Sequence, residues 1–290
     1  MGEAHTKQEV RQFYNRIGWN EVGEGMYQNA RYEDLRPVSH AYIRRCHLRV
    51  NRYLLPKGKY LLDAGCGPIQ YPEYLTYSAG YRYRVCVDIS IVALQEARTR
   101  IGDHGLFVVA DVANLPFKPE CMDGIVSLHT LHHVSTPDQK KSYFGFQRLL
   151  KPGSSAVVVN GWKTSLLMQW MSPLIKGMNR LFAGKTAAPA AGEKTEKTPV
   201  MKEPTGTYVQ KLTAQSLREM LKGLDIEIRC WRSVSVRFLR AVIRPVLLGR
   251  FWLWLLYHLE DLFPRFFGEK GQYPMVILRK PENYQTQAQE

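Results

Sequence analysis

Short apolar runs alternate with amphipathic segments over residues 60–160. Each run is bounded by glycine, proline or a charged residue, as is typical of strands that are buried on both faces of a sheet. The segments between the runs carry apolar residues at helical spacing, and Gly102 lies just beyond one of them as a helix stop. Strands are predicted at residues 60–62, 84–87, 106–110, 123–128, 155–160, 225–231 and 273–279. This alternation predicts a parallel doubly wound sheet with crossovers of one hand.

The remaining segments divide the chain by composition. Residues 1–55 form a polar and aromatic N-terminal helical arm or cap, with an amphipathic helix over residues 37–55. The core extends over residues 56–162 and continues over 207–233, where Thr213 is an N-cap candidate. The other predicted segments are an insertion with a low-complexity, disordered loop (163–206), an apolar, basic helical insertion (234–267), and a last strand with a polar tail (268–290).

Small and polar residues recur where the predicted strands end. Asp63-Ala64-Gly65-Cys66-Gly67 follows the first strand, and neither glycine has a Cβ to keep a ligand from the backbone. Asp88 closes the second strand about twenty residues later, where a dinucleotide fold places the carboxylate that binds ribose. Asp111 follows the third strand, and the segment LHTLHHV (128–134) follows the fourth. Ligands of open α/β sheets bind at the carboxyl ends of the strands, so these four groups should face one crevice.

Together these motifs, with Ala110-Asp111-Val112-Ala113-Asn114-Leu115-Pro116-Phe117 after the third strand, resemble the class I S-adenosylmethionine-dependent methyltransferases. The likeness is to the small-molecule branch that includes quinone-biosynthesis enzymes, and it covers residues 60–162. It implies an α/β, Rossmann-like, mostly parallel seven-stranded sheet with an antiparallel last strand and helical lid insertions after strands five and six. The implied cofactor is S-adenosyl-L-methionine. A dehydrogenase would need a third glycine where this chain has Gln70, which disfavours NAD.

The resemblance also assigns roles to residues of this chain. The methionine part of the cofactor would lie against the first glycine-rich turn, the ribose against Asp88, and the adenine against Asp111 and Val112. Tyr14 lies in an arm that folds over the cofactor in similar enzymes, and an aromatic anchor that packs the arm is an equally good interpretation. The expected cofactor-binding residues are Asp63, Ala64, Gly65, Gly67, Asp88, Ile89, Asp111, Val112, His129 and Tyr14.

Methyl transfer from a sulfonium is an in-line displacement, so alignment and exclusion of water are the main contributions of the protein. If the acceptor is a hydroxyl, a neutral imidazole can take its proton, and His132 or His133 is the candidate base. The alternative for either histidine is a cap or packing role under the loop. Asn160 is a substrate contact or a turn residue.

The net charge of +14 comes from two segments without acidic residues. Residues 139–192 hold eight basic residues, and residues 229–259 hold six arginines. A basic surface attracts phosphate, anionic lipid or acidic substrates. Residues 234–267 are also apolar and rich in tryptophan, so they bind an anionic membrane surface, pack on the sheet as a lid, or contact a second copy. Arg244, Pro245, Arg250 and His258 interrupt every window long enough to span a membrane.

These observations favour a methyltransferase for a small-molecule or lipid acceptor. The five cysteines lack the spacing of a disulfide framework, so the predicted location is cytoplasmic or peripheral to a membrane. They also lack the spacing of a zinc site, and no metal is expected. A nucleic-acid substrate is disfavoured because no RNA-binding module is recognisable. An RNA methyltransferase and a non-catalytic binding protein that retains the fold remain the alternatives. The acceptor and the oligomeric state are left open.

Overall fold

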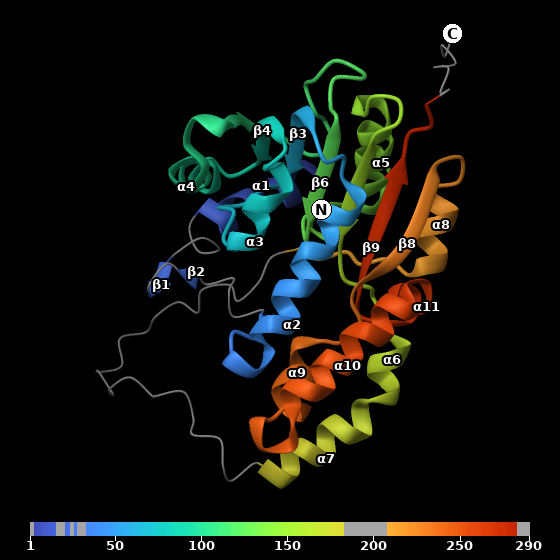
Figure 1. Ribbon diagram of the computed structural model, residues 1–290. Helices are drawn as coiled ribbons and strands as arrows, with labels where there is room; N and C mark the ends of the chain where they lie inside the picture. Colours follow the sequence, from blue (N-terminus) through green and yellow to red (C-terminus); the bar gives the residue numbers. More distant parts are fainter. Residues whose placement is uncertain (1–2, 16–20, 24–25, 28–32, 183–207, 283–290) are drawn as a thin grey trace.

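A seven-stranded sheet forms the centre of the protein (Figure 1). The computed structural model describes residues 3–15, 21–23, 26–27, 33–182 and 208–282. In spatial order the strands are β5 (Gly105–Val109), β4 (Tyr81–Asp88), β3 (Gly58–Ala64), β6 (Gly124–Leu128), β7 (Ser155–Val159), β9 (Tyr273–Arg279) and β8 (Asp225–Arg232). Strands β3 to β7 pair in parallel, and β9 is antiparallel to both of its neighbours. The predicted fold class, with its antiparallel last strand, is confirmed.

Helices follow the strands in the order that the apolar pattern predicts. They are α1 (Glu3–Phe13), α2 (Pro37–Leu48), α3 (Pro72–Leu75), α4 (Ile91–Ile101), α5 (Thr136–Leu149), α6 (Leu166–Trp170), α7 (Ser172–Phe182), α8 (Ala214–Met220), α9 (Val236–Val242), α10 (Gly249–Leu262) and α11 (Pro264–Lys270). Side-chain caps fix several helix starts, because the first N–H groups of a helix have no partner within it. Ser90 caps α4, Ser135 caps α5, and Thr213 caps α8 as predicted.

Two layers of side chains cover the faces of the sheet. On one face, Phe146 and Leu149 of α5 and Leu217 of α8 pack against the central strands. On the other, Val50 and Tyr77 pack with Trp231 of β8. Both layers are closed to solvent, so the sheet is a rigid base from whose carboxyl ends the functional loops project.

The short sheet of β1 (Glu21–Gly23) and β2 (Met26–Tyr27) lies in the arm, where no strand was predicted. The predicted disordered loop, residues 184–206, lies outside the described residues.

The helical insertions gather beyond the carboxyl ends of the parallel strands (Figure 1). Helices α6 and α7 follow β7, and α9 to α11 follow β8. One side of α10 packs on α2, where Leu253 and Tyr257 meet Tyr42. The segment at residues 234–267 is therefore partly built into the fold, as the packing alternative requires. Among the described residues, every helix is too short or too polar to cross a membrane.

Candidate active site

A cavity of about 410 Å³ opens at the carboxyl ends of β3, β4, β6 and β8, within the size range of small-molecule sites. Its wall combines strand ends that are distant in sequence with α1 of the arm. Of the predicted cofactor-binding residues, eight line it: Tyr14, Gly65, Gly67, Asp88, Ile89, Asp111, Val112 and His129. Both candidate bases, His132 and His133, line it as well. The four strand-end motifs therefore meet at one site.

Gly65 and Gly67 form the turn after β3, both at positive φ. A Cβ on Gly65 would lie 2.1 Å from Cγ2 of Thr130, so the close approach of the loop after β6 excludes any other residue there. Asp88 accepts hydrogen bonds from the backbone N–H of Gly67 (3.0 Å) and of Ser90 (2.8 Å). Burial raises the pKa of Asp88 to about 6, against these two bonds. The turn thus presents a nearly buried carboxylate to the cavity.

Asp63 and Ala64 are placed differently from the other predicted residues. They lie within β3 and are absent from the cavity wall among the described residues. The Asp63 carboxylate instead accepts from the guanidinium of Arg84 on β4, at 2.5 and 3.0 Å. This buried ion pair ties β3 to β4 beneath the glycine turn, and a cofactor role for the Asp63 and Ala64 backbone stays a prediction.

Asp111 marks the end of the cavity where adenine is expected. Its carboxylate accepts from the backbone N–H of Ala113 (3.0 Å) and from Nζ of Lys7 (2.7 Å). Lys7 also pairs with Asp138 at 2.8 Å, so one cation of α1 bridges the loop after β5 and the first turn of α5. Although burial opposes it, these hydrogen bonds lower the pKa of Asp111. The arm is thereby fastened over this end of the cavity.

The two candidate bases have different surroundings. His133 is fully bonded: Nδ1 donates to the Tyr208 carbonyl (2.8 Å), which leaves Nε2 to accept from the Tyr14 hydroxyl (2.9 Å). The His132 side chain makes one hydrogen bond among the described residues, between Nδ1 and Oδ1 of Asn160 (3.2 Å). Since the amide oxygen is an acceptor, Nδ1 carries the proton, and in the part of the chain that the structure describes no donor reaches the lone pair of Nε2. Burial, then the neighbouring His133 and His129, holds the pKa of His132 well below its usual range, so its imidazole is neutral at pH 7.

Tyr14 serves as an anchor of the arm, through His133, and also lines the cavity. The hydrogen bond to His133 agrees with the anchor interpretation, and contact of Tyr14 with the cofactor stays a prediction. His129 lies deeper, at positive φ, in edge-to-face contact with Trp231 and Tyr273. Burial, aided by the charge of Arg232, lowers the pKa of His129 to about 3. It is a neutral wall of the cavity.

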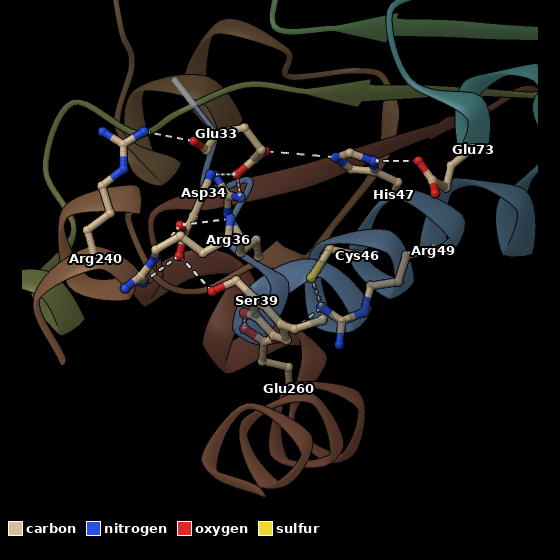
Figure 2. A network of polar contacts seen from close by, with 12 residues as sticks. Glu33, Asp34, Arg36, Ser39, Cys46, His47, Arg49, Glu73, Arg240 and Glu260 are labelled. Carbon is tan, nitrogen blue, oxygen red and sulfur yellow. Dashed lines mark hydrogen bonds and ion pairs between the residues drawn. The ribbon is translucent and has the colours of Figure 1, made fainter. Parts of the chain in front are cut away.

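Glu33 lines the cavity although no pattern in the sequence marks it. Its carboxylate binds the guanidinium of Arg232 at the end of β8, and both side chains are buried. Figure 2 shows Glu33 also facing His47, which in turn meets Glu73 at 3.4 Å. Although burial opposes ionisation, Arg232 lowers the pKa of Glu33 to about 2. This buried network fixes the arm, α2 and β8 around one side of the cavity.

Lys211 is a second residue that the sequence does not indicate. It lines the cavity beside Gly161, where an added Cβ would lie 3.3 Å from its Nζ. Burial lowers the pKa of Lys211. Among the described residues no carboxylate lies within ion-pair distance of it, so its ammonium faces the same region as His132. The wall near His132, where we expect the acceptor, therefore offers the Lys211 amine and a neutral imidazole, and Arg232 lines the same cavity.

The sequence of this chain resembles that of known proteins in the region that builds the cavity. Residues 62–158 match the sequence profile of a methyltransferase domain family. Residues 62–158 are therefore a class I S-adenosylmethionine-dependent methyltransferase domain. Its cofactor is S-adenosylmethionine, and the cavity suits that group: the turn at Gly65 and Gly67, the buried Asp88 carboxylate and Asp111 all line it.

Three relatives show how far the likeness extends. A tRNA (carboxymethyluridine(34)-5-O)-methyltransferase of Arabidopsis thaliana is 37% identical over 123 residues, which are 40% of this chain and 28% of that protein. Methyltransferase GfsG of Streptomyces halstedii is 23% identical over 73% of this chain and 77% of its own. The geranyl diphosphate C-methyltransferase of Streptomyces coelicolor A3(2) has the same fold, with a TM-score of 0.52 and 15% identity over 95% of this chain and 98% of its own. The acceptors in these names differ, so they leave the acceptor of this chain undetermined.

Proposed function

We propose that this protein methylates a hydroxyl group of a small, lipophilic or lipid-linked acceptor, with His132 as the general base. The observation that carries the proposal is the free Nε2 of His132, in a cavity where the nitrogens of His133 are already bonded. A neutral imidazole with an open lone pair is the form a base needs at neutral pH. Asn160 would act as a positioning residue that holds the tautomer.

The cavity wall supports the class of acceptor. Val10 and Phe13 of α1, Val134 and Val209 give it an apolar surface, while Tyr71 and Tyr74 add aromatic rings. A largely apolar wall with a few polar groups suits a lipophilic molecule whose reacting group alone is polar.

The reaction follows from these groups. S-adenosylmethionine would supply the methyl group, and Nε2 of His132 would take the proton of the acceptor hydroxyl as its oxygen is methylated. Lys211 stabilises the negative charge that grows on the oxygen as its proton leaves. The arm, held by Lys7 and Tyr14, keeps water from this centre.

Mass spectrometry can test the proposal directly. The protein is incubated with methyl-labelled S-adenosylmethionine and an extract of small molecules and lipids, and labelled products are identified. We expect an O-methylated, lipophilic product whose formation is lost in His132→Ala. A product methylated on carbon, or one formed at full rate by His132→Ala, would overturn the assignment of the base.

A tRNA acceptor is the second candidate, because the Arabidopsis relative is named for one and the chain is strongly basic. In the same experiment, label in added tRNA would favour it. Binding of tRNA that weakens steeply with salt would support it independently.

A further inference from the structure

The outward side of α10 is apolar. Gly249, Leu253, Tyr257 and Glu260 form its buried side, and Phe251, Trp252, Trp254 and Leu262 lie on the other sides with 50 to 68% of each exposed. Arg250 and His258 are also exposed on this helix, but a surface helix normally turns its large apolar side chains toward the core. The rings of Phe251 and Trp254 stack on each other at 6.1 Å and make a firm aromatic surface. This side of α10 therefore needs a cover that the described residues do not supply.

The same surface continues onto the neighbouring elements. The turn before α10 exposes Val246 (80%) and Leu248 (68%), and α7 exposes Leu181 (71%). Helix α7 packs on α9. The Arg244 guanidinium, just before the turn at residues 245–248, lies over the Phe182 ring at the end of α7, 4.7 Å from its centroid. Leu248 has a left-handed backbone, which is unfavourable for leucine and yet gains no burial. We call this surface, on α7, the turn at residues 245–248 and α10, the α10 face.

Cations border the α10 face. Arg237, Arg250, Lys176 and Arg180 are exposed, and no acidic side chain of the described residues lies within ion-pair distance of them. The acidic residues of α10 are neutralised elsewhere: Glu260 pairs with Arg49, and Asp261 with Arg49 and Arg52. Not every arginine of the segment contributes, because Arg232 binds Glu33 and Arg240 donates to the Glu33 carbonyl. Fewer basic side chains of residues 229–259 are therefore free to border the α10 face than the sequence indicates.

We propose that the α10 face docks on an anionic lipid bilayer. Exposed tryptophan and leucine side chains with a border of arginine and lysine match the boundary between acyl chains and negatively charged headgroups. A second copy of this chain matches less well, since it would bring two cationic borders together. The inference rests on the proposed function in one respect: a lipophilic acceptor would reach the cavity from the bilayer.

The position of the face fits that role. Helices α6 and α7 follow the Gly161 end of β7, and α9 follows the Arg232 end of β8, while Gly161 and Arg232 both line the cavity. Figure 1 shows α7, α9 and α10 together beyond these strand ends. Docking would bring the acceptor side of the cavity toward the lipid.

Vesicle sedimentation tests the proposal with the full-length protein and without any methyl acceptor. Vesicles of phosphatidylcholine alone are compared with vesicles that also contain phosphatidylglycerol. We expect binding to the anionic vesicles only, weakened at least about tenfold in the double variant Trp252→Ser, Trp254→Ser, which removes exposed aromatic area that the bilayer would cover. The pair Lys176→Gln, Arg250→Gln should weaken it by about thirtyfold in total. Phe144→Ser, an exposed aromatic of α5 with Lys140 beside its ring, is the matched control and should bind as wild type does.

Each other outcome overturns the proposal. No binding to anionic vesicles at low salt, or equal binding by wild type and the tryptophan variant, would show that the face does not meet lipid. A dimer in light scattering that dissociates in the tryptophan variant would assign the face to a second copy. Titration of each variant with S-adenosylmethionine separates these results from a failure of the proposed function, since cofactor binding does not depend on the α10 face.

Discussion

The two ends of the cavity are built in different ways. At the cofactor end, Gly65, Gly67, Asp88 and Asp111 come from three consecutive strands, and backbone hydrogen bonds fix their positions. At the acceptor end, an ion pair joins Glu33 of the arm to Arg232 of β8, and Lys211, from the segment before α8, lines the same cavity. The cofactor end can therefore keep its geometry when side chains change elsewhere, whereas the acceptor end depends on each buried pair.

The most disruptive change should be at the acceptor end. In Glu33→Gln, the fully buried Arg232 loses its charged partner, and an uncompensated buried charge costs about 3–5 kcal/mol of unfolding free energy. Urea unfolding measures this loss. In the control Arg218→Gln, an exposed pair with Glu269 is broken, and the cost should be about 1 kcal/mol or less. Equal stabilities would contradict the anchoring role of Glu33.

Replacing the two histidines should separate base from anchor. His132→Ala should lower turnover about a hundredfold or more with little change in cofactor affinity, because it removes a general base. His133→Ala instead removes the partner of Tyr14, so it should loosen the arm and weaken cofactor binding. Rates and cofactor affinity of both variants decide the matter. If His133→Ala had the larger effect on turnover at saturating cofactor, the assignment of His132 would be wrong.

Lowering the pH should weaken the cofactor end specifically. The pKa of Asp88 is raised to about 6, so its carboxylate, the form that accepts from ribose hydroxyls, predominates above this pH and is lost below it. Cofactor affinity should fall as pH decreases through about 6, approaching a tenfold loss for each further unit in the acid range. Calorimetry across about pH 5 to 8 checks the prediction. Asp88→Ala is the control, and it should lose this dependence on pH. An unchanged affinity would show that Asp88 does not bind the cofactor as an anion.

Removing the acceptor-side cation should have a smaller effect. Lys211→Met keeps the length of the side chain and deletes a half-buried charge, so stability should change little. We expect turnover to fall about tenfold, as a stabiliser of developing negative charge is lost, with partial recovery in Lys211→Arg. Steady-state rates with the acceptor identified by mass spectrometry provide the measurement. Unaltered rates in Lys211→Met would remove this residue from the mechanism.

The sequence predicted the cofactor end of the cavity better than the acceptor end. The strands, the caps at Thr213 and the motifs at Gly65, Asp88 and Asp111 could be identified because they depend on local periodicity and on spacing within one sheet edge. Glu33 and Lys211 could not, because only the folded chain brings them to the cavity, and a single glutamate or lysine has no periodic signal. The ion pair between the Asp63 side chain and Arg84 also has no signal in the sequence, while contact of the Asp63 backbone with the cofactor stays a prediction.

The sequence predicts the net charge better than it predicts where the basic side chains lie. The acid-free segments hold the whole excess, but Lys151 pairs with Asp123, and Arg148 donates to the carbonyls of Leu115 and Phe117, away from the helical insertions. Composition fixes net charge, whereas pairing depends on tertiary contacts.

The most direct test of the division between the two ends is calorimetric titration of S-adenosylmethionine into wild type, Asp88→Ala and Lys211→Met. Burial raises the pKa of the Asp88 carboxyl, so its removal should spare the fold. We expect wild type and Lys211→Met to bind with similar affinity, and Asp88→Ala to bind about a hundredfold more weakly because hydrogen bonds to a charged group are lost. Equal binding by wild type and Asp88→Ala, or an equal loss in both variants, would contradict the account.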